Sequence, residues 1–258
     1  MTDITLTRHG HVAVLVIDRP PNNHVSVELI AELADRLEAL DAERDCRAVV
    51  LASAGKVFCG GADLTAPSEV SLSNPNAGPG INALYVEAVR LFSNKKPIVA
   101  AVQGAAVGAG LGLALVADFR IAAPEARFTA NFVKLGFHPG FGITHTLPRL
   151  IGEQRAALMC LTGRRFKADE ALAWGLVDEV VPLDGLREAA LKLAREIAEA
   201  APLAVQSTRT TLRKGIAEAV KAQTDLEFVE QTWLRKTKDF AEGVRSVAER
   251  RVGNFTGT

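Results

Sequence analysis

Apolar residues in the first half of the chain alternate between short unbroken runs and helical spacing. Residues 11–18 and 48–52 are rich in valine and other strand-forming residues, so each is predicted to be a strand. Between them, leucine and isoleucine recur over residues 29–40 at the spacing of one helix face, and Ser26 stands where its side chain can cap that helix. Residues 119–122 add another strand. The alternation predicts right-handed βαβ units around a mainly parallel sheet.

The second half of the chain, from residue 152 onward, is nearly all helical in pattern, with an interruption at residues 177–182. No internal repeat and no low-complexity tract interrupts it. We therefore expect one domain with a helical C-terminal extension. The amphipathic segments predicted to be helices are residues 187–200, 206–233 and 238–251.

An uncharged segment, residues 98–117, carries glycines at intervals of two and four residues between a strand pattern and a helix pattern. Glycine lets the backbone approach a ligand closely. The helix is expected to begin near Ala109, so that its free N–H groups point out of the element and can hold an anion or a developing negative charge. The segment predicts a device that stabilises an oxyanion.

The same 98–117 segment is also long enough, at about 20 residues, to cross a bilayer as a helix. Some of its glycines have the small-xxx-small spacing that packs membrane helices. However, Gln103 lies in the middle of the segment, Pro97 precedes it and the glycines would break a helix there. A buried strand, a turn and a buried helix are therefore favoured over a membrane span.

Composition narrows the class of protein. The 258 residues include 48% hydrophobic and 23% charged side chains, with thirty basic residues against thirty acidic ones. A net charge of zero gives no broad attraction to nucleic acid or membrane phosphates. Cys46, Cys59 and Cys160 lie far apart without metal-binding or disulfide spacing, and the N-terminus lacks a secretory pattern. We expect a cytoplasmic protein without metal, nucleic acid or membrane partners.

Three motifs, in their order and spacing, resemble the crotonase (enoyl-CoA hydratase/isomerase) family. Later landmarks of the same family, at residues 161–163, 171–178 and 242–255, extend the resemblance over essentially the whole chain. The three motifs are Phe58-Cys59-Gly60-Gly61-Ala62-Asp63-Leu64, then Lys96-Pro97-Ile98-Val99-Ala100-Ala101-Val102-Gln103-Gly104 running into Gly108-Ala109-Gly110, then Ala117-Asp118.

The resemblance implies an α/β fold, a crotonase-like spiral of ββα units with a C-terminal helical oligomerisation region. We place the spiral core at residues 1–200 and the trimerisation region at residues 201–258 of one functional domain. The implied ligand is an acyl-CoA thioester, with CoA as part of the substrate and no separate cofactor. The implied assembly is a homotrimer or a dimer of trimers.

By position, the resemblance places the family's two oxyanion N–H donors on Ala62 and Ala109. The family usually has glycine at the second position, but a backbone donor on alanine serves equally if its φ is negative. Enolate formation, addition to the β-carbon and attack on the carbonyl all charge the thioester oxygen, which two preset N–H groups stabilise. The implied substrate contacts are His24, Val25, Gly60, Asp63, Leu64, Val107, Gly108, Phe132 and Gly140.

The acids that move protons in this family are expected to be missing. The two hydratase glutamates fall on Gly112 and Phe132, and neither residue transfers a proton. The acid of the isomerases and the aspartate of the dehalogenase branch fall near Gly140. Standard water addition to a 2-enoyl-CoA is therefore expected to be weak or absent, and a non-catalytic acyl-CoA-binding protein is the alternative function.

Tyr85 and His138 remain as candidate acid/base groups. Tyr85 lies on a predicted helix that borders the family's pocket, where a phenol can exchange a proton, or else its hydroxyl lies at the surface. His138, in a third glycine-rich loop over residues 136–142, titrates near neutrality, or else is simply exposed. Cys59 is expected to be a small buried filler rather than a nucleophile, and Asp118 a buried structural acid. Candidate contacts for CoA phosphates are Lys95, Lys96, Arg250 and Arg251.

Overall fold

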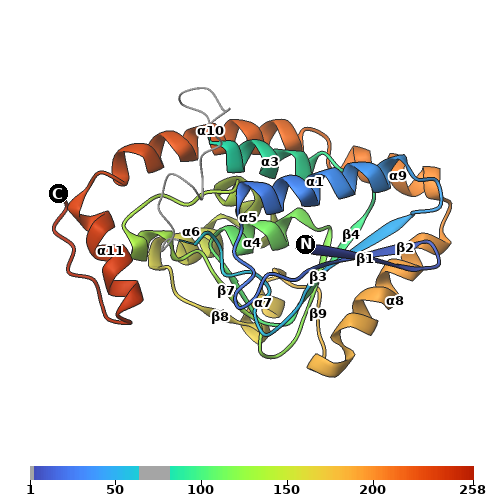
Figure 1. Cartoon of the computed structure of the whole chain (residues 1–258), viewed down its shortest axis with the longest axis horizontal. Coiled ribbons are helices and arrows are strands. Elements are labelled where there is room, and N and C mark those ends of the chain that lie inside the picture. The colour runs from blue at the N-terminus through green and yellow to red at the C-terminus, as the bar shows by residue number, and fades with distance from the viewer. Residues whose placement is uncertain (1–2, 64–81) are drawn as a thin grey trace.

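The computed structural model describes residues 3–63 and 82–258 (Figure 1). These residues form a six-stranded sheet of order β1-β2-β3-β4-β6-β9 and a three-stranded sheet of order β5-β7-β8. In the larger sheet β1 pairs antiparallel with β2 and the other neighbours are parallel, which confirms the predicted mainly parallel sheet. The strands are β1 (Ile4–His9), β2 (Val12–Ile17), β3 (Ala48–Ser53), β4 (Ile98–Val102), β5 (Ala105–Val107), β6 (Phe119–Ala122), β7 (Arg127–Thr129), β8 (Phe166–Lys167) and β9 (Glu179–Val180).

The chain forms successive spiral units, each made of two strands and a helix, in which one strand belongs to the larger sheet and the other to the smaller sheet. β4 lies in the larger sheet, β5 in the smaller one, and α4 (Ala109–Val116) follows. β6 and β7 repeat the arrangement, and after β3 an isolated parallel bridge joins Cys59 to Ala106. This is the crotonase-like spiral that the resemblance to the family implies.

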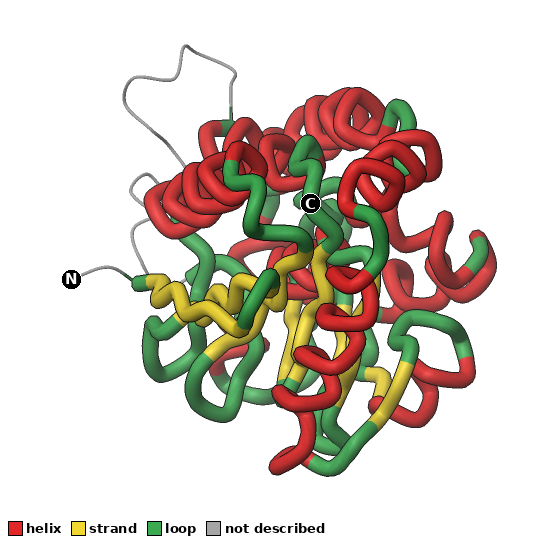
Figure 2. Tube along the Cα trace, turned by 90° about the vertical axis from the view of Figure 1, so that its right-hand side faces the viewer, coloured by secondary structure: helices red, strands yellow, loops and turns green. Residues whose placement is uncertain are grey.

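Helices cover both faces of the larger sheet. α8 packs against β2, β3, β4 and β6 on one face, while α1, α3 and α10 are stacked on the opposite side (Figures 1 and 2). A separate apolar core lies on each side of the larger sheet. Besides α4, the helices are α1 (Val27–Ala42), α3 (Ala83–Phe92), α5 (Ile143–Ile151), α6 (Glu153–Thr162), α7 (Ala168–Ala173), α8 (Leu186–Glu199), α9 (Pro202–Leu212), α10 (Ile216–Leu234) and α11 (Lys238–Ala248). Two 3-10 turns are η1 (Asn131–Leu135) and η2 (Leu183–Gly185).

Helix ends follow the sequence in one case and depart from it in another. The Ser26 side chain accepts a hydrogen bond from the Leu29 N–H at the start of α1, as predicted. The single helix predicted over residues 206–233 is wrong, because the chain breaks between α9 and α10 at Gly215. Gly215 has a φ of 78°, a left-handed conformation that ends a helix and that glycine adopts without strain.

The uncharged segment 98–117 forms two strands and a helix, β4, β5 and α4. A single membrane-spanning helix over these residues is therefore wrong. Throughout residues 3–63 and 82–258, every helix is too short or too polar to traverse a bilayer.

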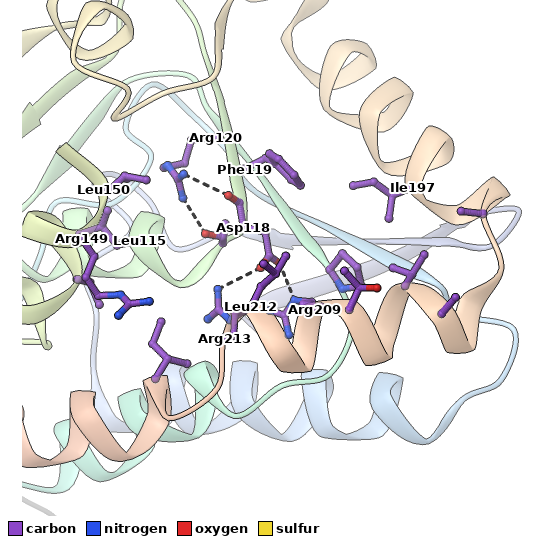
Figure 3. A pocket seen from close by; sticks show the side chains of 18 of the residues that line it. Leu115, Asp118, Phe119, Arg120, Arg149, Leu150, Ile197, Arg209, Leu212 and Arg213 are labelled. Carbon is purple, nitrogen blue, oxygen red and sulfur yellow. Dashed lines mark hydrogen bonds and ion pairs between the residues drawn. The ribbon is translucent and has the colours of Figure 1, made fainter. Parts of the chain in front are cut away.

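Asp118, directly before β6, ties the C-terminal helices to the sheet. Its carboxylate accepts hydrogen bonds from the Ile98 N–H at 2.8 Å, from Arg209 at 2.8 Å and from Arg213 at 3.1 Å. Figure 3 shows these side chains converging beside a cavity of about 630 Å³ between α9 and the sheet. The prediction of a structural acid is confirmed, but Asp118 is partly rather than fully buried, with a side chain 14% exposed.

Candidate active site

A cavity of about 540 Å³ opens where the start of α4, the segment 60–63 and helix α10 meet. The larger cavity beside α9 contains none of the predicted site residues, so its size does not make it the active site. The predicted residues that line the 540 Å³ cavity are His24, Gly60, Ala62, Asp63, Tyr85, Val107, Gly108, Ala109, Phe132 and Gly140.

One predicted substrate contact, Val25, stands apart from this cavity. Val25 is 1% exposed and is absent from the cavity lining, and its N–H donates to the Gly61 carbonyl at 2.9 Å. It therefore supports the cavity wall rather than contacting a ligand there. Leu64 lies outside the described residues.

The direction of the Ala62 N–H is set by the Gly61 carbonyl, which belongs to the same peptide group. The Gly61 carbonyl accepts from the Val25 N–H at 2.9 Å and lies 3.1 Å from His24 Nδ1. In a trans peptide the C=O and the following N–H point in opposite directions, so the Ala62 N–H points away from both groups. Within residues 3–63 and 82–258 this N–H has no hydrogen-bond acceptor.

The Ala109 amide is directed in the same way by α4. The Gly108 carbonyl accepts from the Leu111 N–H at 2.9 Å and the Gly112 N–H at 3.2 Å, so it points into the helix. The Ala109 N–H therefore points outward from the first residue of α4, as expected of a helix N-terminus. Ala109 has a negative φ, so alanine fits there without strain.

Glycine at position 61 brings the two amides into one neighbourhood. Gly61 has a φ of 83°, and a Cβ added to it would lie 2.6 Å from the Val107 carbonyl oxygen and 3.6 Å from the Ala109 nitrogen. A contact of 2.6 Å is too short for any side chain to occupy. The absence of a side chain therefore allows the Gly61–Ala62 peptide to lie directly against the start of α4.

Tyr85 lies in the same cavity, and the alternative of a surface hydroxyl is wrong. The residue is 8% exposed, and its hydroxyl donates to Gln231 Oε1 at 2.9 Å. A Cβ on Gly140 would fall 1.8 Å from the Tyr85 oxygen, so the hydroxyl takes the space of a side chain at residue 140. Burial, and then the nearby Glu227 carboxylate, raise the pKa of Tyr85 well above its usual range. The phenol is therefore a neutral hydrogen-bonding group at pH 7.

His138 is not brought to the two alanine amides. It lines a separate cavity of about 360 Å³ with Thr144, Cys160 and Leu234, and its Nδ1 lies 2.8 Å from the Pro139 carbonyl oxygen. The 136–142 loop turns Gly140 toward the candidate site and the His138 ring away from it. This geometry gives no support to His138 as the acid or base.

Cys59 behaves as the predicted filler. It is fully buried, and burial raises the pKa of its thiol to about 12, so the nucleophilic thiolate is disfavoured at pH 7. It also faces the close approach of α4, because a Cβ on Gly110 would lie 2.1 Å from the Cys59 carbonyl oxygen. Both observations assign Cys59 to packing.

Aromatic rings fill the space around the positions expected to align with the hydratase glutamates. A Cβ on Gly112 would lie 2.7 Å from the Phe141 ring. Phe132 lines the cavity and meets Phe137 edge to face, with ring centroids 5.5 Å apart. In the described part of the chain, Asp63 is the one carboxylate that lines this cavity.

Several cavity residues were missed from the sequence. Gln231 on α10 is 1% exposed, and its Nε2 donates to the His138 carbonyl while its Oε1 accepts from Tyr85. Arg235, directly after α10, places its guanidinium 5.4 Å from the centre of the Phe137 ring, and burial lowers its pKa. In the sequence, Gln231 does not differ from the rest of the predicted amphipathic helix, and Arg235 lies beyond its predicted end. Other missed lining residues include Asn131, Arg165 and Val247.

Two of the four basic residues expected to contact CoA phosphates are engaged elsewhere. Lys96 is 3% exposed and donates through Nζ to the Glu43 carbonyl, and Arg251 pairs with Glu242. None of the four predicted basic residues lines the candidate site. Arg165 and Arg235 supply its positive charge in the described part of the chain.

A buried carboxylate, Glu227 on α10, fixes the loop beside the site. It accepts from the Gly142 N–H at 2.8 Å, the Thr144 N–H at 3.1 Å and the Thr144 hydroxyl at 2.5 Å. These bonds cap the start of α5 and favour the ionised acid, but burial outweighs them and raises the pKa of Glu227 to about 7. The folded protein therefore holds this proton more tightly than the unfolded chain does.

The raised pKa of Glu227 predicts a pH-dependent contribution to stability. The contribution is full below pH 4.5 and is lost as the pH rises through 7, so the free energy of unfolding of the wild type should fall relative to Glu227→Gln. The expected relative change between pH 5 and pH 8 is about 2–3 kcal/mol, from about 1.4 kcal/mol per pKa unit. Urea denaturation at four pH values measures it. Glu230→Gln, on the same helix, is the matched control, and a flat difference for Glu227→Gln would contradict the prediction.

Comparison with known proteins agrees with the spiral fold. A model of the enoyl-CoA hydratase/isomerase family matches residues 7–258. A probable enoyl-CoA hydratase of Mycobacterium tuberculosis is 40% identical over 245 residues, which cover 95% of this chain and 92% of that protein. The 2,3-dehydroadipyl-CoA hydratase of Escherichia coli is 34% identical, with complete coverage of both chains.

Solved structures are similar over the full length. The crystal structure of a carnitinyl-CoA hydratase from Mycobacterium avium superimposes with a TM-score of 0.88 at 34% identity and covers 100% of both chains. An enoyl-CoA hydratase/isomerase from Pseudoalteromonas atlantica gives a TM-score of 0.88 at 31% identity, with 98% of this chain and 100% of that chain covered. The fold is that of an acyl-CoA enzyme of the hydratase and isomerase type. The chain belongs to the enoyl-CoA hydratase/isomerase (crotonase) family.

Proposed function

We propose that this protein acts on an acyl-CoA thioester and stabilises its enolate with the N–H groups of Ala62 and Ala109. The observation that carries the proposal is the orientation of two peptides, in which the Gly61 and Gly108 carbonyls are both hydrogen-bonded away from the cavity. Each donor of such a pair contributes about 2.7–4 kcal/mol to the transition state. The positive end of the α4 dipole adds to the same field.

The other residues that line the cavity suit a bound acyl group, and the family's usual pair of glutamates is not among those described. Phe132 and Phe137 supply an apolar wall, while Arg235 supplies positive charge for an anionic part of the ligand. Tyr85 offers a neutral hydroxyl, and Asp63 is the remaining carboxylate of the described lining. We therefore propose hydratase/isomerase-like thioester chemistry with a non-standard acid/base and weak standard hydration.

Acetoacetyl-CoA tests the enolate, because its enolate absorbs in the near ultraviolet and no turnover is needed. Titration of the protein with this thioester at pH 7 is expected to produce enolate absorbance beyond that of the free ligand, and CoA alone is the blank. Crotonyl-CoA is expected to be hydrated slowly. Absence of the enolate signal would overturn the proposal, while efficient hydration of crotonyl-CoA would overturn its non-standard acid/base.

The alternative is an acyl-CoA-binding protein without catalysis, and it is favoured by the described lining of the cavity, in which Asp63 is the one carboxylate. A panel of enoyl-, hydroxyacyl- and malonyl-type thioesters separates the two. Binding with no product from the whole panel would support the alternative, and product from any member would support the enzyme.

We further propose a homotrimer or a dimer of trimers in the cytoplasm. Large apolar side chains on the C-terminal helices support an assembly, since Leu203 is 80% exposed and Leu212 is 74% exposed in the single chain. Free cysteines, including the buried Cys46, suit a reducing compartment. Sedimentation velocity tests the assembly, and a monomer at micromolar concentration would overturn it.

A further inference from the structure

His24 lies between two backbone segments at the wall of the candidate site. Its Nδ1 is 3.1 Å from the Gly61 carbonyl oxygen, and its Nε2 is 3.3 Å from Asn22 Nδ2. A Cβ on Gly60 would lie 3.0 Å from His24 Cε1, so the imidazole packs directly against the Gly60 backbone. The ring is therefore held on three sides.

These contacts fix which nitrogen of His24 carries the proton. A carbonyl oxygen accepts hydrogen bonds and cannot donate them, so Nδ1 carries the hydrogen and donates it to Gly61. With the Asn22 amide placed as it is, Nε2 is left as the acceptor for Asn22 Nδ2. The neutral imidazole satisfies both partners in one tautomer.

The orientation of the Gly61–Ala62 peptide depends on the groups that hydrogen-bond to its carbonyl oxygen. The peptide follows Gly60 and Gly61, two residues with little intrinsic backbone stiffness, and Gly61 has a φ of 83°. The Val25 N–H donates to the Gly61 carbonyl, and an isolated parallel bridge pairs Val25 with Ala62. A second donor restricts the tilt of the peptide, and a hydrogen bond to its carbonyl also polarises the peptide, which strengthens its N–H as a donor.

We propose that His24 is a positioning residue that orients and polarises the Gly61–Ala62 peptide, so that the Ala62 N–H is held toward the thioester oxygen. The inference rests on the proposed oxyanion function of Ala62. It assigns His24 a role through the peptide, distinct from the ligand contact that its place in the cavity lining suggests.

Substitutions at His24 separate the two roles with acetoacetyl-CoA as the probe. His24→Leu removes the donor, and the association constant measured by enolate absorbance is expected to fall about five- to tenfold, the usual worth of one hydrogen bond. Binding of CoA, which has no thioester carbonyl, is expected to stay within about twofold. His24→Asn keeps an N–H donor at the δ position and should retain most of the enolate signal. His24→Gln places its N–H donor one atom further along the side chain, so its association constant should resemble that of His24→Leu.

His11 provides the matched control. Its Nδ1 also lies 3.0 Å from a carbonyl oxygen, that of Asp45, but His11 does not line the candidate site. His11→Leu is expected to leave the enolate signal unchanged. Circular dichroism and thermal midpoints identify which variants fold, and the asparagine and glutamine variants carry the comparison if leucine does not.

The outcomes distinguish this inference from the proposed function. If the wild type forms no enolate, the proposed function fails and the inference fails with it. If the wild type forms enolate and the leucine and glutamine variants match it, the inference alone is overturned. If His24→Leu weakens CoA as much as acetoacetyl-CoA, or if asparagine gives no rescue, His24 is a ligand contact and not a positioning residue.

Discussion

Proline in place of Ala109 is expected to lower the rate of any reaction through a thioester enolate by about 100-fold or more. Proline has no backbone N–H, so the substitution deletes one of the two proposed donors, worth about 2.7–4 kcal/mol. The first residue of a helix is where proline is best tolerated, and α4 begins at Ala109. The preceding residue, Gly108, is not in the α conformation that proline disfavours, with φ 54° and ψ −119°.

Ala109→Gly is the matched control, because it changes the side chain and keeps the N–H. It should retain enolate formation from acetoacetyl-CoA within a few-fold, whereas Ala109→Pro should lose the signal. The proline ring also enters the space beside the amide, so the affinity for CoA alone is measured for both variants. A proline variant that folds and still forms the enolate would show that Ala109 is not a donor.

The two proposed backbone donors came from the sequence by different routes: the glycine-rich pattern predicts a helix that begins near Ala109, and the resemblance to the family points to Ala62. Ala62 and Ala109 follow glycines whose lack of a side chain dictates where the chain bends, and an amide needs no particular side chain to act as a donor. Gly61 shows the physical reason, since a Cβ there would meet the Val107 carbonyl. A donor defined by chain geometry therefore leaves a signal in the spacing of glycines.

The side-chain parts of the site could not be placed in the same way. Tyr85, Gln231 and Glu227 meet because α10 packs beside α3 and α5, and the rotation of one helix on another depends on tertiary contacts. Within the 136–142 loop, Gly140 and His138 face different cavities, although they are only two residues apart. Local sequence cannot tell which side of such a loop faces the ligand.

The largest expected effect on stability comes from removing the Asp118 carboxylate. Asp118→Ala leaves Arg209 and Arg213 without their shared anion (Figure 3). It also leaves the buried Ile98 N–H without an acceptor. Removing one partner of a buried ion pair costs about 3–5 kcal/mol, because the remaining charge stays buried and uncompensated. Burial lowers the pKa of Arg213 most, and the nearby charges of Arg209 and Arg120 lower it further, so their repulsion adds to the loss. Urea denaturation near pH 7 measures the loss.

Two comparison variants show whether burial of charge is the cause. The exposed pair Lys221 and Asp225, with side chains 64% and 66% exposed, is expected to contribute about 0–1 kcal/mol, so Asp225→Ala should have little effect. Arg213→Leu should cost far less than Asp118→Ala, because two nitrogens of Arg213 are buried without hydrogen-bond partners in the described residues. Because α9 does not line the candidate site, folded Asp118→Ala should bind acetoacetyl-CoA like the wild type. Equal losses for Asp118→Ala and Asp225→Ala would contradict the assignment of Asp118 as the anion that anchors α9.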